Sequence, residues 1–116
     1  MAENSDSLIF DRQKHFPDLV VKLVYSCNGW VFGSACETDN PRDYDVFIPL
    51  SYWRRATMLI PKDAKINSMG GFKCLSEGKE VDVWTGEMSD MLASRFFKCA
   101  YHPITDIKIK KENSNI

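Results

Sequence analysis

The stretch that decides the fold runs from Trp30 to Leu50 and reads W-V-F-G-S-A-C-E-T-D-N-P-R-D-Y-D-V-F-I-P-L. It starts as a short apolar strand, breaks at Gly33-Ser34, and passes through a polar loop. An apolar strand expected over 43–50 follows, and it carries Asp43 and Asp45. Because side chains two residues apart on a strand share a face, these two carboxylates are predicted to project together.

A third aspartate, Asp82, lies in a second apolar strand expected over 80–84, with the sequence E-V-D-V-W. If the two strands pair, Asp82 joins the other two at a cross-strand Cβ distance of roughly 4.5–5.5 Å. Carboxylates this close raise one another's pKa and favour a divalent cation, and Mg²⁺ prefers such oxygen ligands. The alternative is that the aspartates simply face solvent, with Asp82 in an unrelated hairpin.

The Gly33-Ser34 turn predicts a second part of the same site. A glycine at the end of a buried strand lets the backbone approach a ligand closely. The following amides are expected to open a short helical turn that favours an anion, and the Ser34 hydroxyl adds a donor. The alternative is a plain turn followed by a helix cap.

Further elements are expected on both sides of this region. The Pro17–Ser26 stretch has apolar residues at helical spacing, and Asn28-Gly29 ends the helix. The other expected elements are a helix from Leu8 to His15, a helix over 52–59 capped by Ser51, an irregular strand over 65–75, a tight turn at Glu77-Gly78-Lys79, a helix over 90–98 capped by Ser89, and a half-exposed strand over 104–109. Residues 1–6 and 111–116 are expected to be flexible.

Size and composition indicate one ordinary domain. The chain has 116 residues, of which 44% are hydrophobic and 27% charged, and its formal net charge is -1. This charge argues against binding along a nucleic acid, which needs a basic face. The start of the chain does not resemble a leader, and no apolar run has the length of a membrane span.

The cysteine pattern predicts reduced thiols. Four cysteines occur, at positions 27, 36, 74 and 99, and no two have the C-x-x-C spacing of a zinc knuckle. Nothing in the spacing recommends a disulfide pairing, so free thiols in a cytoplasmic setting are expected.

Taken together, these motifs resemble the nucleotidyltransferase superfamily typified by DNA polymerase beta. The matching residues are V-F-G-S at Gly33-Ser34, D-Y-D at Asp43 and Asp45, and V-D-V-W at Asp82, within roughly residues 17–86. The resemblance implies an α+β fold for the whole of residues 1–116, with a small mixed sheet and helices packed on one face. It also implies that the three aspartates are catalytic and hold two Mg²⁺ ions, or Mn²⁺ in their place, with Asp82 helping to deprotonate an acceptor hydroxyl.

The same resemblance implies a substrate and partners. Gly33 and Ser34 would grip the triphosphate of a nucleoside triphosphate. Arg42 and Lys73 are candidate phosphate contacts, although Arg42 is equally well explained as a solvated loop residue. Transfer of a nucleoside monophosphate to a protein or RNA hydroxyl would release pyrophosphate, in the cytoplasm of a prokaryotic cell or of an infected host cell.

The chain departs from the family in having about thirty residues after Trp84, too few for the usual helical domain. Acceptor recognition would then come from a partner subunit or a homodimer. Two rival hypotheses stay open. One is a non-catalytic nucleotide- or partner-binding module of the same fold, and the other is an unrelated α+β interaction module.

Overall fold

A computed structural model describes residues 16–38, 40–95 and 97–111. The predictions for residues 1–6, for the helix from Leu8 to His15 and for most of the C-terminal tail fall outside these ranges. The helices are α2 (Asp18–Cys27), α3 (Ser34–Glu37), the 3-10 helix η1 (Leu50–Tyr52), α4 (Trp53–Leu59) and α5 (Met88–Ala93). The strands are β1 (Trp30–Phe32), β2 (Asp43–Pro49), β3 (Lys65–Ile66), β4 (Phe72–Ser76), β5 (Lys79–Gly86), β6 (Cys99–His102) and β7 (Ile107–Lys110).

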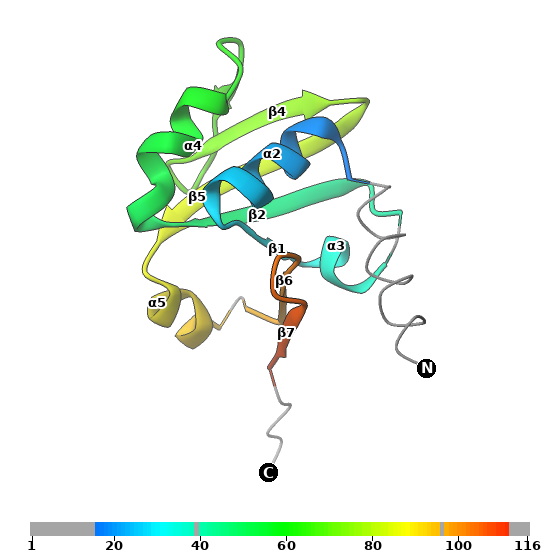
Figure 1. The fold of residues 1–116 in the computed structure, drawn as a ribbon, viewed down its shortest axis with the longest axis vertical. Helices are drawn as coiled ribbons and strands as arrows, with labels where there is room; N and C mark the ends of the chain where they lie inside the picture. The colour runs from blue at the N-terminus through cyan, green and yellow to red at the C-terminus, as the bar shows by residue number, and fades with distance from the viewer. Residues whose placement is uncertain (1–15, 39, 96, 112–116) are drawn as a thin grey trace.

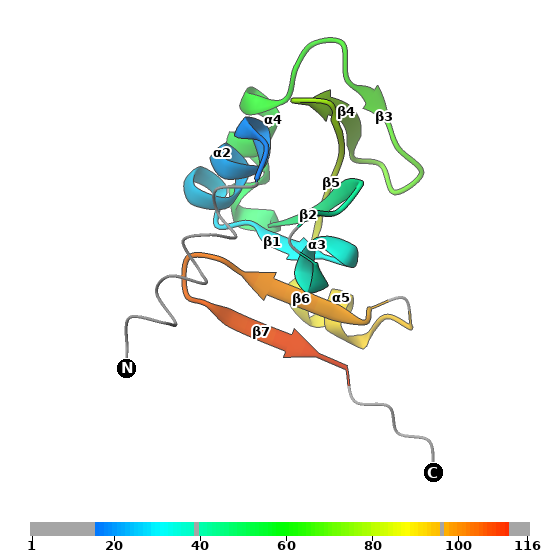
Figure 2. The ribbon, with the colours of Figure 1, turned by 90° about the vertical axis from the view of Figure 1, so that its right-hand side faces the viewer.

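The strands form one seven-stranded sheet in the order β3-β4-β5-β2-β1-β6-β7. Strands β2 and β5 pair in parallel, whereas the other neighbouring strands pair antiparallel. Figures 1 and 2 show the sheet curving from β7 at one end to β3 at the other. The predicted α+β class with a mixed sheet is confirmed.

The parallel β2–β5 pair sets which residues face the main core. Tyr44, Val46 and Ile48 of β2 are fully buried, and so are Val81 and Val83 of β5. In the register of the two strands Tyr44 lies beside Val81 and Val46 beside Val83. The alternate residues, which include the aspartates, therefore face the other side of the sheet.

Helices α2 and α4 cover the main core. The buried stripe of α2 consists of Leu19, Val20, Leu23, Val24 and Cys27, and α4 contributes Ala56. The first turn of α2 is tied to the sheet because the Leu19 amide donates to Ser76 Oγ at 3.2 Å. The helix ends at Asn28, whose φ of 55° is left-handed, as the Asn-Gly signal predicted.

The opposite face of the sheet has a second apolar cluster. Phe32, Phe47, Phe97 and Ala100 form it, and Met88, Met91 and Leu92 of α5 pack against it. The prediction that the helices pack on one face is therefore wrong for α5. The physical reason is that the aromatic residues on this second face also need cover from water.

Three sequence-based assignments need correction. Helix α5 ends at Ala93, and residues 99–102 form the buried strand β6 because they pair with β1 and β7. The expected strand over 65–75 is two strands separated by a loop. Neither Ser51 nor Ser89 caps a helix, since Ser51 lies inside η1 and Ser89 inside α5.

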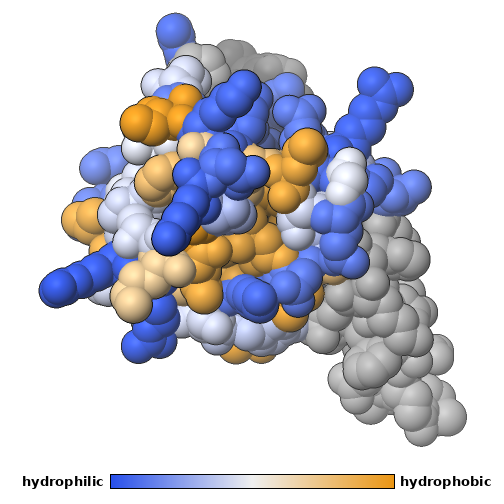
Figure 3. All heavy atoms as spheres, turned by 90° about the horizontal axis from the view of Figure 1, so that it is seen from above, coloured by the Kyte–Doolittle hydropathy of each residue, from blue (hydrophilic) through white to orange (hydrophobic). Residues whose placement is uncertain are grey.

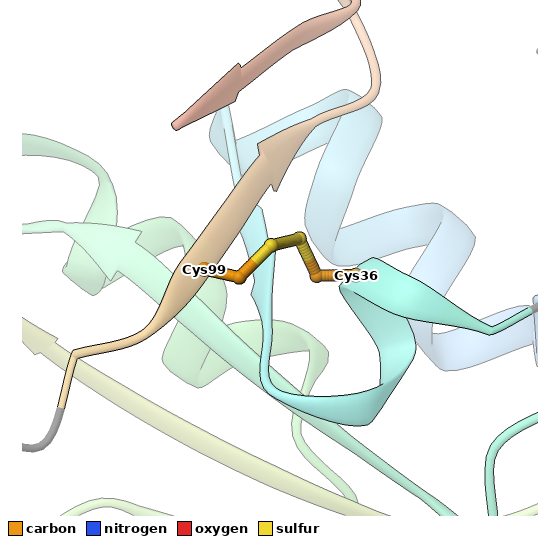
Figure 4. The surroundings of a disulfide bond; sticks show 2 residues. All are labelled: Cys36 and Cys99. Atoms are coloured by element: carbon orange, nitrogen blue, oxygen red, sulfur yellow. A yellow bond between two sulfur atoms is a disulfide. The ribbon is translucent and has the colours of Figure 1, made fainter. Parts of the chain in front are cut away.

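The expectation of reduced thiols is wrong for two of the four cysteines. Cys36 of α3 and Cys99 of β6 form a disulfide with a Cα–Cα distance of 6.4 Å (Figure 4). Their sequence separation of 63 residues hid the pairing, which exists because the fold brings α3 beside β6. Cys27 and Cys74 are free thiols.

No helix in the described ranges is long and apolar enough to cross a membrane.

The loop between β3 and β4 packs its backbone directly onto β5, which predicts a large cost for one glycine substitution. A Cβ added at Gly71 would lie 1.9 Å from the carbonyl oxygen of Val83, so Gly71→Ala should destabilise the fold by about 3 kcal/mol or more. Gly70 has a φ of +79° but open space around it, so Gly70→Ala should cost about 1 kcal/mol. Urea unfolding of both variants measures the difference, and equal losses would contradict this packing.

Candidate functional site

The sheet brings Asp45 and Asp82 side by side. The two residues are register partners on the parallel strands β2 and β5, so their side chains lie on the same face. Asp43 shares that face, two residues before Asp45, and pairs in register with Glu80. The expected meeting of the three aspartates on one face of the sheet is thus observed.

Asp45 has a strongly raised pKa. Its pKa is raised from 3.8 to about 6, first because it is half-buried and then because Asp43 and Asp82 repel its negative charge. Lys73 acts in the opposite direction and lowers the pKa. Burial and the neighbouring carboxylates therefore both disfavour the charged form of Asp45.

Asp82 has protein partners for both of its oxygens. Asn67 Nδ2 donates a hydrogen bond to Asp82 Oδ1 at 3.2 Å, and Lys73 Nζ lies 3.8 Å from Oδ2. Lys73 is the register partner of Asp82 on β4 and also lies 3.8 Å from a carboxylate oxygen of Glu80. Its ammonium group is thus shared between two carboxylates.

The Gly33-Ser34 turn lies against Asp45. Gly33 has a φ of +66°, and a Cβ built there would lie 3.1 Å from Asp45 Oδ2. A larger residue would therefore be strained in its backbone and would also crowd the carboxylate. This contact explains physically why the strand ending at Phe32 is followed by glycine.

A pocket of about 640 Å³ opens beside the carboxylates. Of the predicted site residues, Gly33, Asp45, Lys73 and Asp82 line it. Three other predicted residues are not among its lining. They are Ser34, Arg42 and Asp43, of which Ser34 and Arg42 are exposed and Asp43 is half-buried.

One wall of the pocket is the segment from β3 to β4, which the sequence analysis missed. Asn67 organises this segment, because its Oδ1 accepts hydrogen bonds from the amides of Met69 at 3.0 Å and Gly71 at 2.8 Å. The signal was an Asn shortly before Gly70-Gly71, a pattern typical of a side-chain-stabilised turn. Lys65 lines the same wall and faces Lys73 in register.

The segment also exposes apolar side chains at its end of the molecule. The exposed fractions are 78% for Ile66 and 68% for Met69, and Met58 of the neighbouring α4 is also exposed. In Figure 3, which views this end from above, apolar atoms gather inside a surround of hydrophilic side chains. Ile66 and Met69 belong to the pocket lining, so the apolar surface reaches the pocket.

The opposite wall is aromatic and basic. Phe32, Trp84, Phe97 and Met91 line it, with Lys98 beside them. The rings of Phe32 and Trp84 are 5.7 Å apart, and Trp84 Nε1 is buried without a hydrogen-bond partner among the described residues. The pocket thus joins an apolar wall to carboxylates and lysines, which suits a ligand with a flat apolar part and an anionic part.

The carboxylates provide oxygen ligands of the kind that Mg²⁺ binds, but they do not surround a single position. Within the described ranges, no group of three or more His, Cys, Asp and Glu side chains is arranged to hold one metal ion. An ion shared by Asp45 and Asp82 would compete with Asn67 and Lys73, which already contact the Asp82 carboxylate. The oxygen donors and the raised pKa of Asp45 fit a hard divalent cation.

The raised pKa of Asp45 predicts how Asp45→Asn changes stability with pH. Between about pH 4 and the folded pKa of about 6, the folded state binds more protons than the unfolded state, so the free energy of unfolding falls as pH rises. Two pKa units correspond to about 3 kcal/mol, and solvent screening of this half-exposed group reduces that to about 1 kcal/mol. Asp45→Asn should therefore be about 1 kcal/mol more stable than wild type at about pH 8.

The two proteins should be equally stable at about pH 4, where both carry a neutral group at this position. Chemical unfolding across this pH range measures the effect. Asp63→Asn is the control, since Asp63 is exposed and does not line the pocket. A variant that is less stable than wild type at about pH 8 would contradict repulsion within the cluster.

Comparison of the chain with protein-family models, with curated proteins and with solved structures finds no match.

Proposed function

We propose that this protein is a Mg²⁺-dependent nucleotidyltransferase, which transfers a nucleoside monophosphate from a nucleoside triphosphate to a hydroxyl group. The observation that carries the proposal is the register pairing of Asp45 with Asp82, with Gly33 against Asp45. Two carboxylates at the edge of a pocket, next to a close backbone turn, provide a place for metal ions and a phosphate chain to meet.

Lysines of the pocket support the phosphate part of this proposal. Lys65 and Lys73 face each other on β3 and β4, and like charges in that position repel. Glu80 and Asp82 offset part of the charge of Lys73, which lies 3.8 Å from each of them. Lys98 adds a third positive charge on the opposite wall. A triphosphate would gain from all three lysines, whereas a neutral ligand would leave Lys65 and Lys73 repelling each other.

The aromatic wall supports the nucleoside part. Phe32 and Trp84 line the pocket next to the carboxylates, Trp84 is the partly exposed ring of the two, and Met91 offers a polarisable contact. A nucleobase is a flat ring that such a wall can hold by stacking. The resulting order, with the base on the aromatic wall and the phosphates towards the lysines, brings the phosphate chain to Asp45 and Asp82.

The reaction balances as a displacement at phosphorus. An acceptor hydroxyl oxygen forms a bond to the α-phosphorus, the bond from that phosphorus to the bridging oxygen breaks, and pyrophosphate leaves with the electron pair. The hydroxyl proton goes to a carboxylate of the cluster, and the family resemblance assigns this role to Asp82. Bound Mg²⁺, or Mn²⁺, would neutralise charge on the phosphates, held by Asp45 and Asp82 with Asp43 beside them.

The acceptor in this proposal is a hydroxyl on a protein or an RNA. A partner subunit or a second copy of the chain would position the acceptor, in the cytoplasm of a prokaryotic or infected host cell. The exposed Ile66 and Met69 border the pocket and offer apolar surface for such a partner.

A second candidate function is a nucleotide-binding module without catalysis. It is favoured by one observation, namely that Asp82 is held by Asn67 and Lys73 and does not form a metal group with Asp45 in this structure. In such a module Lys73 would serve as a permanent counter-ion. The pocket would then bind a nucleotide through the lysines and the aromatic wall.

Nucleotide binding with and without metal tests the proposal. Thermal unfolding should shift upward with at least one of ATP, GTP, CTP and UTP in the presence of Mg²⁺, and much less without Mg²⁺. Asp82→Asn should weaken Mg²⁺-nucleotide binding about tenfold or more, because it removes a metal ligand's charge. Asp106→Asn, outside the pocket lining, is the control. Stabilisation independent of Mg²⁺ would favour the binding module, and no response to any nucleotide would reject both.

Substitution of Lys73 separates metal binding from phosphate binding. Because Lys73 competes with a cation for Asp82, Lys73→Gln should strengthen the affinity for Mn²⁺ alone by a few-fold. The same variant should weaken the binding of Mg²⁺-ATP about tenfold, because a phosphate contact is lost. Isothermal calorimetry measures both affinities, and Lys62→Gln, an exposed lysine of the preceding loop, is the control. Equal changes in the same direction would contradict this double role.

A further inference from the structure

The disulfide connects two parts of the candidate site. Cys36 lies in α3, two residues after Ser34, and Cys99 lies in β6 and lines the pocket. Figure 4 shows the two side chains meeting between the short helix and the strand. The cross-link thus joins the segment after the Gly33-Ser34 turn to β6, whose first residue also borders the pocket.

Little else within α3 fixes that turn. The helix has four residues and no side-chain cap, and its first hydrogen bonds are from the Cys36 amide to the Gly33 carbonyl and from the Thr38 amide to the Ser34 carbonyl. A single helical turn is unstable without tertiary contacts. Here those contacts are the buried Ala35 and the Cys36–Cys99 bond.

The Gly33-Ser34 turn sets the distance between the backbone and the Asp45 carboxylate. Gly33 is close enough to the carboxylate that a Cβ would lie 3.1 Å from Asp45 Oδ2, so small movements of α3 change the space beside Asp45. The ligand pocket and the disulfide therefore share one segment of the chain, from Gly33 to Thr38.

We propose that the Cys36–Cys99 disulfide is a redox-dependent positioning element for this site. In the oxidised protein it holds the Gly33-Ser34 turn against Asp45 and favours ligand binding. Reduction releases the turn and weakens binding. The ligand part of the inference rests on the proposed function, whereas the release of the turn does not.

The redox step needs a thiol such as glutathione. Two glutathione molecules reduce the disulfide to two cysteine thiols, transferring two electrons and two protons, and become glutathione disulfide. Both sulfur-bearing residues are buried, at 0% exposure for Cys36 and 1% for Cys99. Reduction therefore requires a local opening of α3 or β6, and a ligand that holds the pocket closed should oppose it.

Amide hydrogen exchange tests the release of the turn without any ligand. In the reduced wild type, exchange at the Cys36 and Thr38 amides should accelerate about tenfold or more relative to the oxidised protein. The Val21 amide, which donates to the Pro17 carbonyl in α2, should keep its rate and serves as an internal control. Equal exchange at Cys36 and Thr38 in both states would overturn the proposal.

Ligand affinity tests the coupling to the site. The Kd of Mg²⁺-ATP should be about tenfold higher for reduced than for oxidised protein, and linkage then requires saturating Mg²⁺-ATP to lower the disulfide's reduction potential by about 30 mV. A Cys36→Ala/Cys99→Ala variant should match the reduced protein, and Cys74→Ser, which removes a free thiol, should match the oxidised one.

The outcomes are distinguishable. Equal affinity in both redox states would overturn the coupling. If neither state binds any nucleotide, the proposed function fails, and the exchange experiment alone decides whether the disulfide positions the turn. If the double alanine variant does not fold, reduced and oxidised wild type still provide the comparison.

Discussion

The structure depends on the parallel register between β2 and β5. In that register Val46 lies beside Val83 and Asp45 beside Asp82, so one pairing fills the core and builds the acidic cluster at once. Because side chains alternate along a strand, a slip of one residue would place aspartates in the core under α2 and valines in the pocket. The burial of the valines therefore fixes the register that brings Asp45 beside Asp82. The free energy that holds the aspartates together comes from the core and not from contacts within the site.

The acidic cluster is stable because the fold surrounds it with partial compensation. Lys73 and Asn67 satisfy Asp82, while Asp45 stays half-buried with a pKa near the physiological range. The cost of holding Asp45 in this cluster, about 1 kcal/mol, is small beside the stability of a folded domain. In the proposed function a cation would compete with Lys73 for Asp82 and would offset the charge of Asp45.

The sequence was sufficient for the strands that carry the three aspartates, because strand periodicity and the Asn28 and Gly78 turn signals act over a few residues. It was wrong for the caps at Ser51 and Ser89. It was insufficient where distant segments decide. Strand β6, with the residues Cys-Ala-Tyr-His, has neither alternation nor β-branched residues, and it is a strand because β1 and β7 lie on either side of it. The second apolar face under α5 was missed for the same reason, whereas the Asn67 turn had a local signal in the Asn before Gly70-Gly71.

The disulfide is another feature that depends on distant segments, since its two cysteines are 63 residues apart in the sequence. Cysteine spacing and the absence of zinc motifs in the sequence favoured free thiols. Neither feature indicates which cysteines the fold brings together. Once β6 lies beside β1, Cys99 is carried to α3, where Cys36 is buried. In reducing compartments disulfides are uncommon and mostly serve as redox sensors, whereas in oxidising ones they are structural. A bond that fixes the turn next to Asp45 has a consequence for the site in either setting, because the position of Gly33 depends on whether the bond is formed.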